Sequence, residues 1–162
     1  MWSVRKRAGT AATNDRINLG NFANAITAAG IATIIGGVLD DQITGAAADM
    51  AVDVLAIDGG GETTADTLVI TGAVALDAND MAGVSDIEKI VLASDAAHSL
   101  AINDANVLAG EAMTIDASIV TASAVTVDAS AETDGAVQYT GGDGIDTLTV
   151  NAPMFATGTG AT

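Results

Sequence analysis

The chain has 162 residues, and although 49% of them are apolar, only two Phe, one Trp and one Tyr are present, which disfavours a globular core of large side chains. The 21 acidic and 5 basic residues give a formal net charge of −16, which opposes binding to nucleic acid and to anionic membranes. Because the chain has no cysteine, it can form neither disulfides nor thiolate metal sites, and it has no cysteine nucleophile.

Residues 1–16 form a basic, polar arm that holds four of the five basic residues: Arg5, Lys6, Arg7 and Arg16. Residues 17–162 carry 20 acidic residues and a single base, Lys89. We therefore expect the arm to dock on the acidic body of a neighbouring copy and to mediate assembly. Polar residues follow the arginines before any apolar run, so no secretory signal peptide is expected.

Residues 17–35 are predicted as a short helical cap over one end of a solenoid, because Phe22, Ile26, Ala29 and Thr33 fall on one helical face. The alternative is a set of short strands broken at Gly20 and Gly30. The apolar stretch that begins at Phe22 is shorter than about 20 residues and is diluted by Ala, Gly, Thr and Asn. No membrane insertion is therefore expected.

From residue 36 to residue 150 the chain is repetitive, with short β-branched runs between Asp, Gly and Asn turns. Ile102, Ile115 and Val127 each precede an Asp or Asn turn and follow one another at nearly equal steps along the chain. This step fits half a rung of a solenoid. We therefore predict a parallel β-solenoid over residues 36–150 in preference to a β-sandwich, with a tail over 151–162. The predicted strands are 51–57, 67–71, 73–77, 87–93, 99–103, 112–116, 124–128, 136–140 and 147–150.

One segment, residues 141–149 (GGDGIDTLT), matches the nonapeptide G-G-x-G-x-D-x-U-x at every specified position. Calcium takes six to eight oxygen ligands, and glycines let a chain turn its carbonyls toward an ion. The predicted metal-binding residues are therefore Gly141, Gly142, Asp143, Gly144 and Asp146, with the side chain of Leu148 pointing into the core.

Two weaker copies could complete such sites. Residues 36–44 keep Gly36, Gly37 and Asp41, and residues 59–69 keep Gly59, Gly60 and Asp66. The pairs Asp41/Ile43 and Asp66/Leu68 are separated by the length of two such half-rung steps, which again fits one rung. The remaining repeat carboxylates are interpreted as solvated turn residues that would become ligands only if stacked: Asp77, Asp104, Asp116 and Asp128.

Together with the segments GVSDIEKIVLAS, HSLAINDANVLAGEAMTIDAS and VTVDASAETDGAVQYTGGDGIDTL, the nonapeptide resembles the RTX-type β-roll proteins and related bacterial surface-layer and giant adhesin proteins. The resemblance implies one-step export, calcium (Ca²⁺) as the cofactor, and a structural or adhesive role outside the cell. The chain departs from that family in having one intact nonapeptide rather than a tandem array.

Few residues favour an enzyme. His98 is the only histidine and is expected in a surface turn, and no G-x-S-x-G or Walker motif is present. Trp2 lies in the arm and Tyr139 stands alone, so aromatic platforms for a sugar are scarce.

The sequence therefore predicts a non-enzymatic, extracellular or cell-surface module that forms a homo-oligomer or polymer, with a cell-surface polysaccharide as a candidate partner. The alternatives are a virion component, such as a phage fibre or capsid-decorating protein, and a carbohydrate-binding or polysaccharide-active solenoid.

Overall fold

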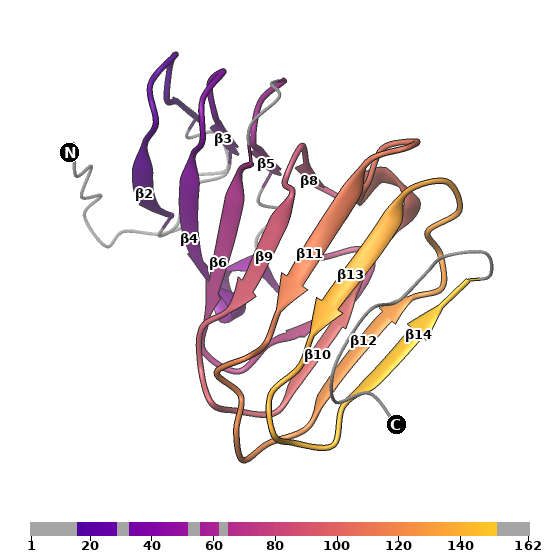
Figure 1. Cartoon of the computed structure of the whole chain (residues 1–162). Helices are drawn as coiled ribbons and strands as arrows, with labels where there is room; N and C mark the ends of the chain where they lie inside the picture. Colours follow the sequence, from indigo (N-terminus) through magenta and orange to yellow (C-terminus); the bar gives the residue numbers. More distant parts are fainter. Residues whose placement is uncertain (1–15, 29–32, 52–55, 62–64, 152–162) are drawn as a thin grey trace.

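The structure is a computed structural model, and it describes residues 16–28, 33–51, 56–61 and 65–151. The chain winds into a parallel β-solenoid in which each rung lies on the one before it (Figure 1). All strand pairs in the described residues are parallel. The predicted fold class is thus confirmed.

One sheet, called here the long sheet, receives a strand from every rung. Its six strands lie in chain order across the front of Figure 1. They are β2 (Ala25–Ala28), β4 (Gln42–Ala46), β6 (Thr67–Thr71), β9 (Lys89–Leu92), β11 (Ala112–Asp116) and β13 (Ala136–Thr140).

Two four-stranded sheets share the rest of the solenoid wall. The N-terminal sheet consists of β1 (Arg16–Asn18), β3 (Thr33–Ile35), β5 (Ala56–Asp58) and β8 (Val84–Ser85). The C-terminal sheet consists of β7 (Ala75–Leu76), β10 (His98–Ala101), β12 (Val125–Ala129) and β14 (Thr147–Val150). The cross-section therefore changes along the molecule, since the first sheet ends where the second begins.

Short helical segments mark this change of wall. Helix α1 (Ala47–Met50) follows β4 and contacts β7, the first strand of the C-terminal sheet. The 3-10 turn η1 (Asp104–Asn106) contacts β8, the last strand of the N-terminal sheet. There the Asn106 side chain donates to the carbonyl oxygens of Met81 and Val84, at 2.7 and 2.8 Å, and so closes the edge of that sheet.

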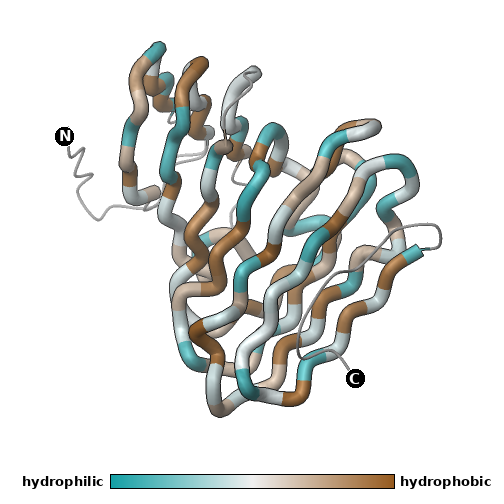
Figure 2. Tube along the Cα trace, in the orientation of Figure 1, coloured by the Kyte–Doolittle hydropathy of each residue, from teal (hydrophilic) through white to brown (hydrophobic). Residues whose placement is uncertain are grey.

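The core is a set of aliphatic columns, because equivalent inward positions stack in register. In the long sheet, the column runs through Ile26, Ile43, Leu68, Ile90, Ile115 and Tyr139. Inward and outward residues alternate along the strands, as the burial of β12 and the hydropathy in Figure 2 show. Burial of each such side chain contributes about 1.5–3 kcal/mol.

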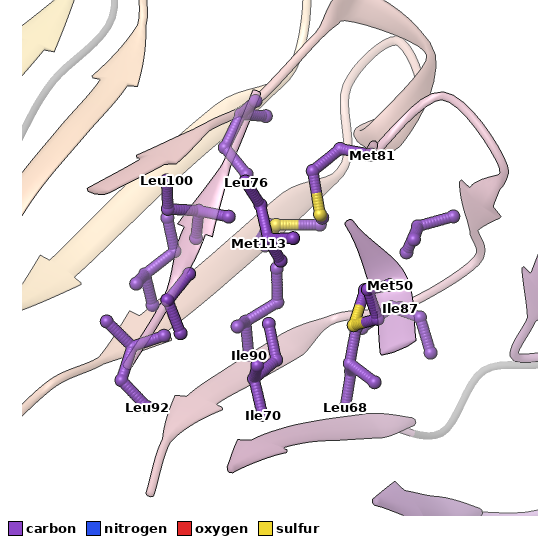
Figure 3. Close-up of a cluster of buried hydrophobic side chains, with 14 of the residues drawn as sticks. Met50, Leu68, Ile70, Leu76, Met81, Ile87, Ile90, Leu92, Leu100 and Met113 are labelled. Carbon is purple, nitrogen blue, oxygen red and sulfur yellow. The ribbon is translucent and has the colours of Figure 1, made fainter. Parts of the chain in front are cut away.

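Methionines fill the interior near the change of wall. Met50, Met81 and Met113 are at most 2% exposed and lie among aliphatic side chains in Figure 3. An unbranched thioether adapts to irregular gaps better than Ile or Val, which suits rungs whose cross-section differs from that of their neighbours.

The predicted helical cap over 17–35 is wrong. The described part of this segment contains β1, β2 and β3, so the alternative of short strands is correct, with a break at Gly20, whose φ is +73°. Gly30 and Ala29 lie outside the described residues. Phe22, placed on the same helical face as Ile26, is 73% exposed. Ile26, which the helix also placed on that face, is buried and pairs with Ile43 of the next rung, and the partly buried Ile17 pairs with Ile34.

Candidate functional site

The nonapeptide segment forms the corner between β13 and β14. Asp146 is fully buried there, and its Oδ1 accepts a hydrogen bond from the backbone N–H of Val125 at 3.1 Å. Asp143 is exposed, so the two predicted carboxylate ligands lie in different environments. Leu148 packs against the core beside Val127, as expected.

The glycines of this corner allow close approach of backbone to backbone. A Cβ atom on Gly142 would lie 1.8 Å from the carbonyl oxygen of Val120, and one on Gly144 would lie 2.0 Å from that of Ser123. At Gly141 it would lie 2.2 Å from Oδ2 of Asp146. None of the three has a positive φ. Stacking on the previous rung requires glycine at 142 and 144, and the Asp146 carboxylate of the same corner requires it at 141.

The first weaker copy forms the equivalent corner between β3 and β4. Asp41 is 2% exposed, and its Oδ2 accepts from the Gly37 N–H at 2.8 Å. Its Oδ1 accepts from the backbone N–H and from the side-chain amide of Asn24, each at 2.8 Å. Gly36 lies against the next rung, because a Cβ there would be 1.7 Å from the Gly59 carbonyl oxygen.

The second weaker copy repeats this arrangement one rung later. Asp66 is fully buried, and its Oδ1 accepts from the Asp41 N–H at 2.6 Å, which confirms that these aspartates stack one rung apart. The Asp66 N–H donates in turn to Oε2 of Glu88 at 2.6 Å. A Cβ on Gly59 would meet the Asp86 carbonyl oxygen at 1.7 Å, and Gly60 has a φ of +115°, so both positions require glycine.

These contacts share one pattern, called here the rung clasp. A side chain at or just before the start of a strand accepts a hydrogen bond from the backbone N–H at the matching position of the previous rung. The donor and acceptor pairs are Asn24 and Asp41, Asp41 and Asp66, Asp66 and Glu88, Val74 and His98, and Val125 and Asp146. Each clasp satisfies a buried or partly buried backbone amide.

His98 belongs to this pattern, so its expected position in a surface turn is wrong. It is 4% exposed and begins β10. Nδ1 accepts from the Val74 N–H at 3.1 Å, which leaves Nε2 to donate to the Ser94 carbonyl oxygen at 2.8 Å. Since both ring nitrogens are engaged by the backbone, the ring has a structural role.

Between β8 and β9, Asp86 and Glu88 lie close to other acidic side chains, and their pKa values are shifted. Burial, followed by the charge of Asp58 and a hydrogen bond with it, raises the pKa of Asp86 above its ordinary value. Burial is also the main cause that raises the pKa of Glu88, with the charges of Asp66 and Glu111 adding to it. The charged forms of both groups are therefore disfavoured in the fold.

A carboxylate group that the sequence did not predict as a site lies nearer the C-terminal end. Asp104, Glu132 and Asp134 each place one carboxylate oxygen within 4.8 Å of the others. Asp104 is one of the repeat carboxylates expected to become a ligand only if stacked, and the other two residues follow it one rung later in the sequence. Only the stacking of successive rungs, which no local motif records, brings them together.

The other repeat carboxylates stabilise their own turns or strands. Asp77 accepts from the Asn79 N–H at 2.7 Å, and Asp128 accepts from the Ser130 N–H at 3.0 Å. Asp116 forms an ion pair with Lys89, with Nζ and Oδ2 2.8 Å apart.

Within the basic arm, Arg16 is exposed in β1 and its Nε donates to Oδ1 of Asn18 at 3.2 Å. Arg5, Lys6 and Arg7 lie outside the described residues.

Comparison of the chain with protein-family models, with curated proteins and with solved structures gave no significant match. The resemblance to RTX-type proteins therefore stays an expectation. Among the described residues, no helix is long and apolar enough to cross a membrane.

Proposed function

We propose that this chain is a non-enzymatic structural module of the extracellular space, of the surface-layer, matrix-fibre or adhesin kind, that assembles with copies of itself. The observation that carries the proposal is the in-register stacking of rungs. Within the described residues, β2 and β13 are the two edge strands of the long sheet, and each presents backbone groups to which a further strand could bond. A stack that can accept another rung at either end is suited to end-to-end assembly.

Charge supports a second mode of contact. The basic arm and a body with 20 acidic residues and one base are complementary, so the arm of one copy fits the acidic face of the next. A cell-surface polysaccharide is a further candidate partner.

His98 and Tyr139 are side chains of kinds that enzymes use, but here both are held in the fold, which supports a structural role. The imidazole of His98 is held by the backbone on both sides, and Tyr139 is 1% exposed in the core, so its ring offers no platform to a sugar. Burial and the neighbouring Asp146 carboxylate raise the pKa of the Tyr139 hydroxyl well above its ordinary value, which keeps it neutral.

Calcium binding by the glycine-rich corners is part of the proposal. It draws on the full nonapeptide match and on the high density of carboxylates. Binding to the folded state alone would stabilise the fold by about 2.7 kcal/mol at a concentration 100 times the dissociation constant.

Assembly is tested by sedimentation velocity. We expect association at low ionic strength that weakens with added salt and with EDTA, and that falls when the arm is neutralised in R5Q/K6Q/R7Q. K89Q, which removes a positive charge from the body, is the control and should associate as the unsubstituted chain does. Monomers under all conditions would contradict the proposal, and a closed trimer indifferent to EDTA would favour the virion component.

The calcium component is tested by thermal unfolding followed by far-UV circular dichroism. Calcium should raise the midpoint temperature more than magnesium at equal ionic strength, because an irregular set of oxygen ligands suits the larger ion. If EDTA left both the fold and the assembly unchanged, the calcium component would fail.

A further inference from the structure

The carboxylate group formed by Asp104, Glu132 and Asp134 joins two successive rungs. Asp104 lies in η1, before β11, and the other two lie in the loop between β12 and β13. Asp104 and Asp134 are exposed, whereas Glu132 is fully buried. The group thus combines one buried carboxylate with two exposed ones.

The geometry of the group is held by backbone contacts. Oδ1 of Asp104 accepts from the N–H and the hydroxyl of Thr133, at 2.9 and 2.6 Å. Oε1 of Glu132 accepts from the N–H groups of Asp134 and Gly135, at 3.0 and 2.6 Å. Glycine at 135 permits the close approach, since a Cβ there would lie 2.5 Å from Cγ1 of Val107. The carboxylates are therefore positioned before any ligand arrives.

One buried oxygen of the group has no hydrogen-bond partner among the described residues. Oε2 of Glu132 is buried and accepts no hydrogen bond from the described residues. A buried, unpaired carboxylate oxygen costs several kcal/mol unless it is neutralised or coordinated. Lys89, the one basic residue after Arg16, is engaged with Asp116 instead. Among the described residues no base is therefore left to pair with this oxygen, and a cation bound from solution would supply the counter-charge.

We propose that Asp104, Glu132 and Asp134 bind a calcium ion that clasps the last two rungs together. Three carboxylates and no nitrogen or sulfur ligand are the donor set of a hard cation. Carboxylates on two loops, completed by water, suit the flexible coordination of calcium better than the strict octahedron of magnesium. With few protein ligands, the dissociation constant should be about 10⁻⁴–10⁻³ M, in the range of extracellular modules.

This site is separate from the nonapeptide corner, so the test must report on each corner by itself. Amide ¹H–¹⁵N spectra of the full chain are recorded during titration with calcium chloride at constant ionic strength. We expect the Ala105, Thr133, Asp134 and Gly135 amides to shift along one saturating curve. The Gly142, Gly144 and Asp146 amides report on the nonapeptide corner, so failure there leaves this proposal standing.

Two variants decide whether the shifts come from this group. D134N changes only an exposed side chain and should weaken binding about tenfold, through the loss of one charged ligand. E132Q keeps the acceptor for the Asp134 and Gly135 N–H groups and should abolish saturation. D143N, which removes an exposed carboxylate from the nonapeptide corner, is the control and should leave the curve unchanged. Absence of these shifts up to about 10 mM calcium, or equal curves in D134N and the parent chain, would overturn the proposal.

Discussion

At the residue scale, the rung clasps explain why acidic side chains occur inside an aliphatic solenoid. At the corners of Asp66, His98 and Asp146 a backbone N–H is buried, and a carboxylate or imidazole one rung later accepts its hydrogen bond. Leaving such a donor unpaired would cost about 1–3 kcal/mol. Burial of Asp41, Asp66 and Asp146 is therefore a consequence of stacking.

Asp146 tests this account. Replacement by alanine removes the acceptor for the Val125 N–H and should lower the free energy of unfolding by about 2–4 kcal/mol, whereas D146N keeps an acceptor oxygen and should lose less. Urea unfolding in EDTA measures both variants without calcium. If the two variants unfolded alike in EDTA and differed only with calcium present, Asp146 would act as a ligand rather than as a clasp.

At the element scale, corner glycines set how closely one rung lies on the next. In Gly142→Ala the new Cβ would have to displace the backbone carbonyl of Val120, so we expect a loss of at least about 2 kcal/mol. Gly61→Ala is the matched control, because a Cβ at that corner meets nothing within 4 Å and should be tolerated. Equal unfolding midpoints in urea for the two variants would contradict the close stacking described for the β13–β14 corner.

Strands with alternating β-branched residues were predictable from the sequence. Four predicted ranges coincide with β6, β11, β13 and β14, and the half-rung step places Ile115 and Val127 on opposite walls. Within the predicted strand at 51–57, residues 52–55 lie outside the described part of the chain. In the first two rungs, β1, β2 and β3 were predicted only as the alternative and β4 was missed, because Ile26 and Ile43 are closer together in the sequence than any later pair of stacked residues in their column.

The sites were harder to predict, because a motif does not record which way a side chain points. The G-G-x-G-x-D pattern located a real corner, but whether Asp146 faces solvent or the core depends on the rung beneath it. Likewise, Asp104 meets Glu132 only because the intervening rung has a particular length.

At the scale of the whole molecule, the excess of negative charge makes stability depend on pH. Asp86 and Glu88 have raised pKa values in the fold, so their charged forms are destabilising at neutral pH and stability should rise as the pH falls toward the ordinary carboxyl range. Hydrogen bonds lower the pKa values of Asp95 and Asp128, from Ala122 and Thr121 in the first case and from Ser130 in the second. The stability that these two carboxylates contribute to the fold should be lost as the pH falls through their lowered pKa values. A stability maximum on the mildly acidic side is therefore expected.

In the double variant D86N/E88Q, stability should rise less as the pH falls from 7. Thermal midpoints measured from pH 7 to pH 4 should be higher than those of the parent chain at pH 7 and should converge with them near the maximum. D40N/D143N removes two exposed carboxylates and is the matched control for net charge alone. A control that flattened the rise equally would assign the effect to overall repulsion instead of to the stacked corner.

The unbroken column of the long sheet has a consequence for how the chain tolerates change in length. The stretch of chain between successive members of that column varies, and is shortest from Ile26 to Ile43, yet the register never slips. Differences in length are absorbed where the chain leaves one wall for the next. Such bends could accept grafted peptides and display them along the solenoid, while the stacked interior stays as it is.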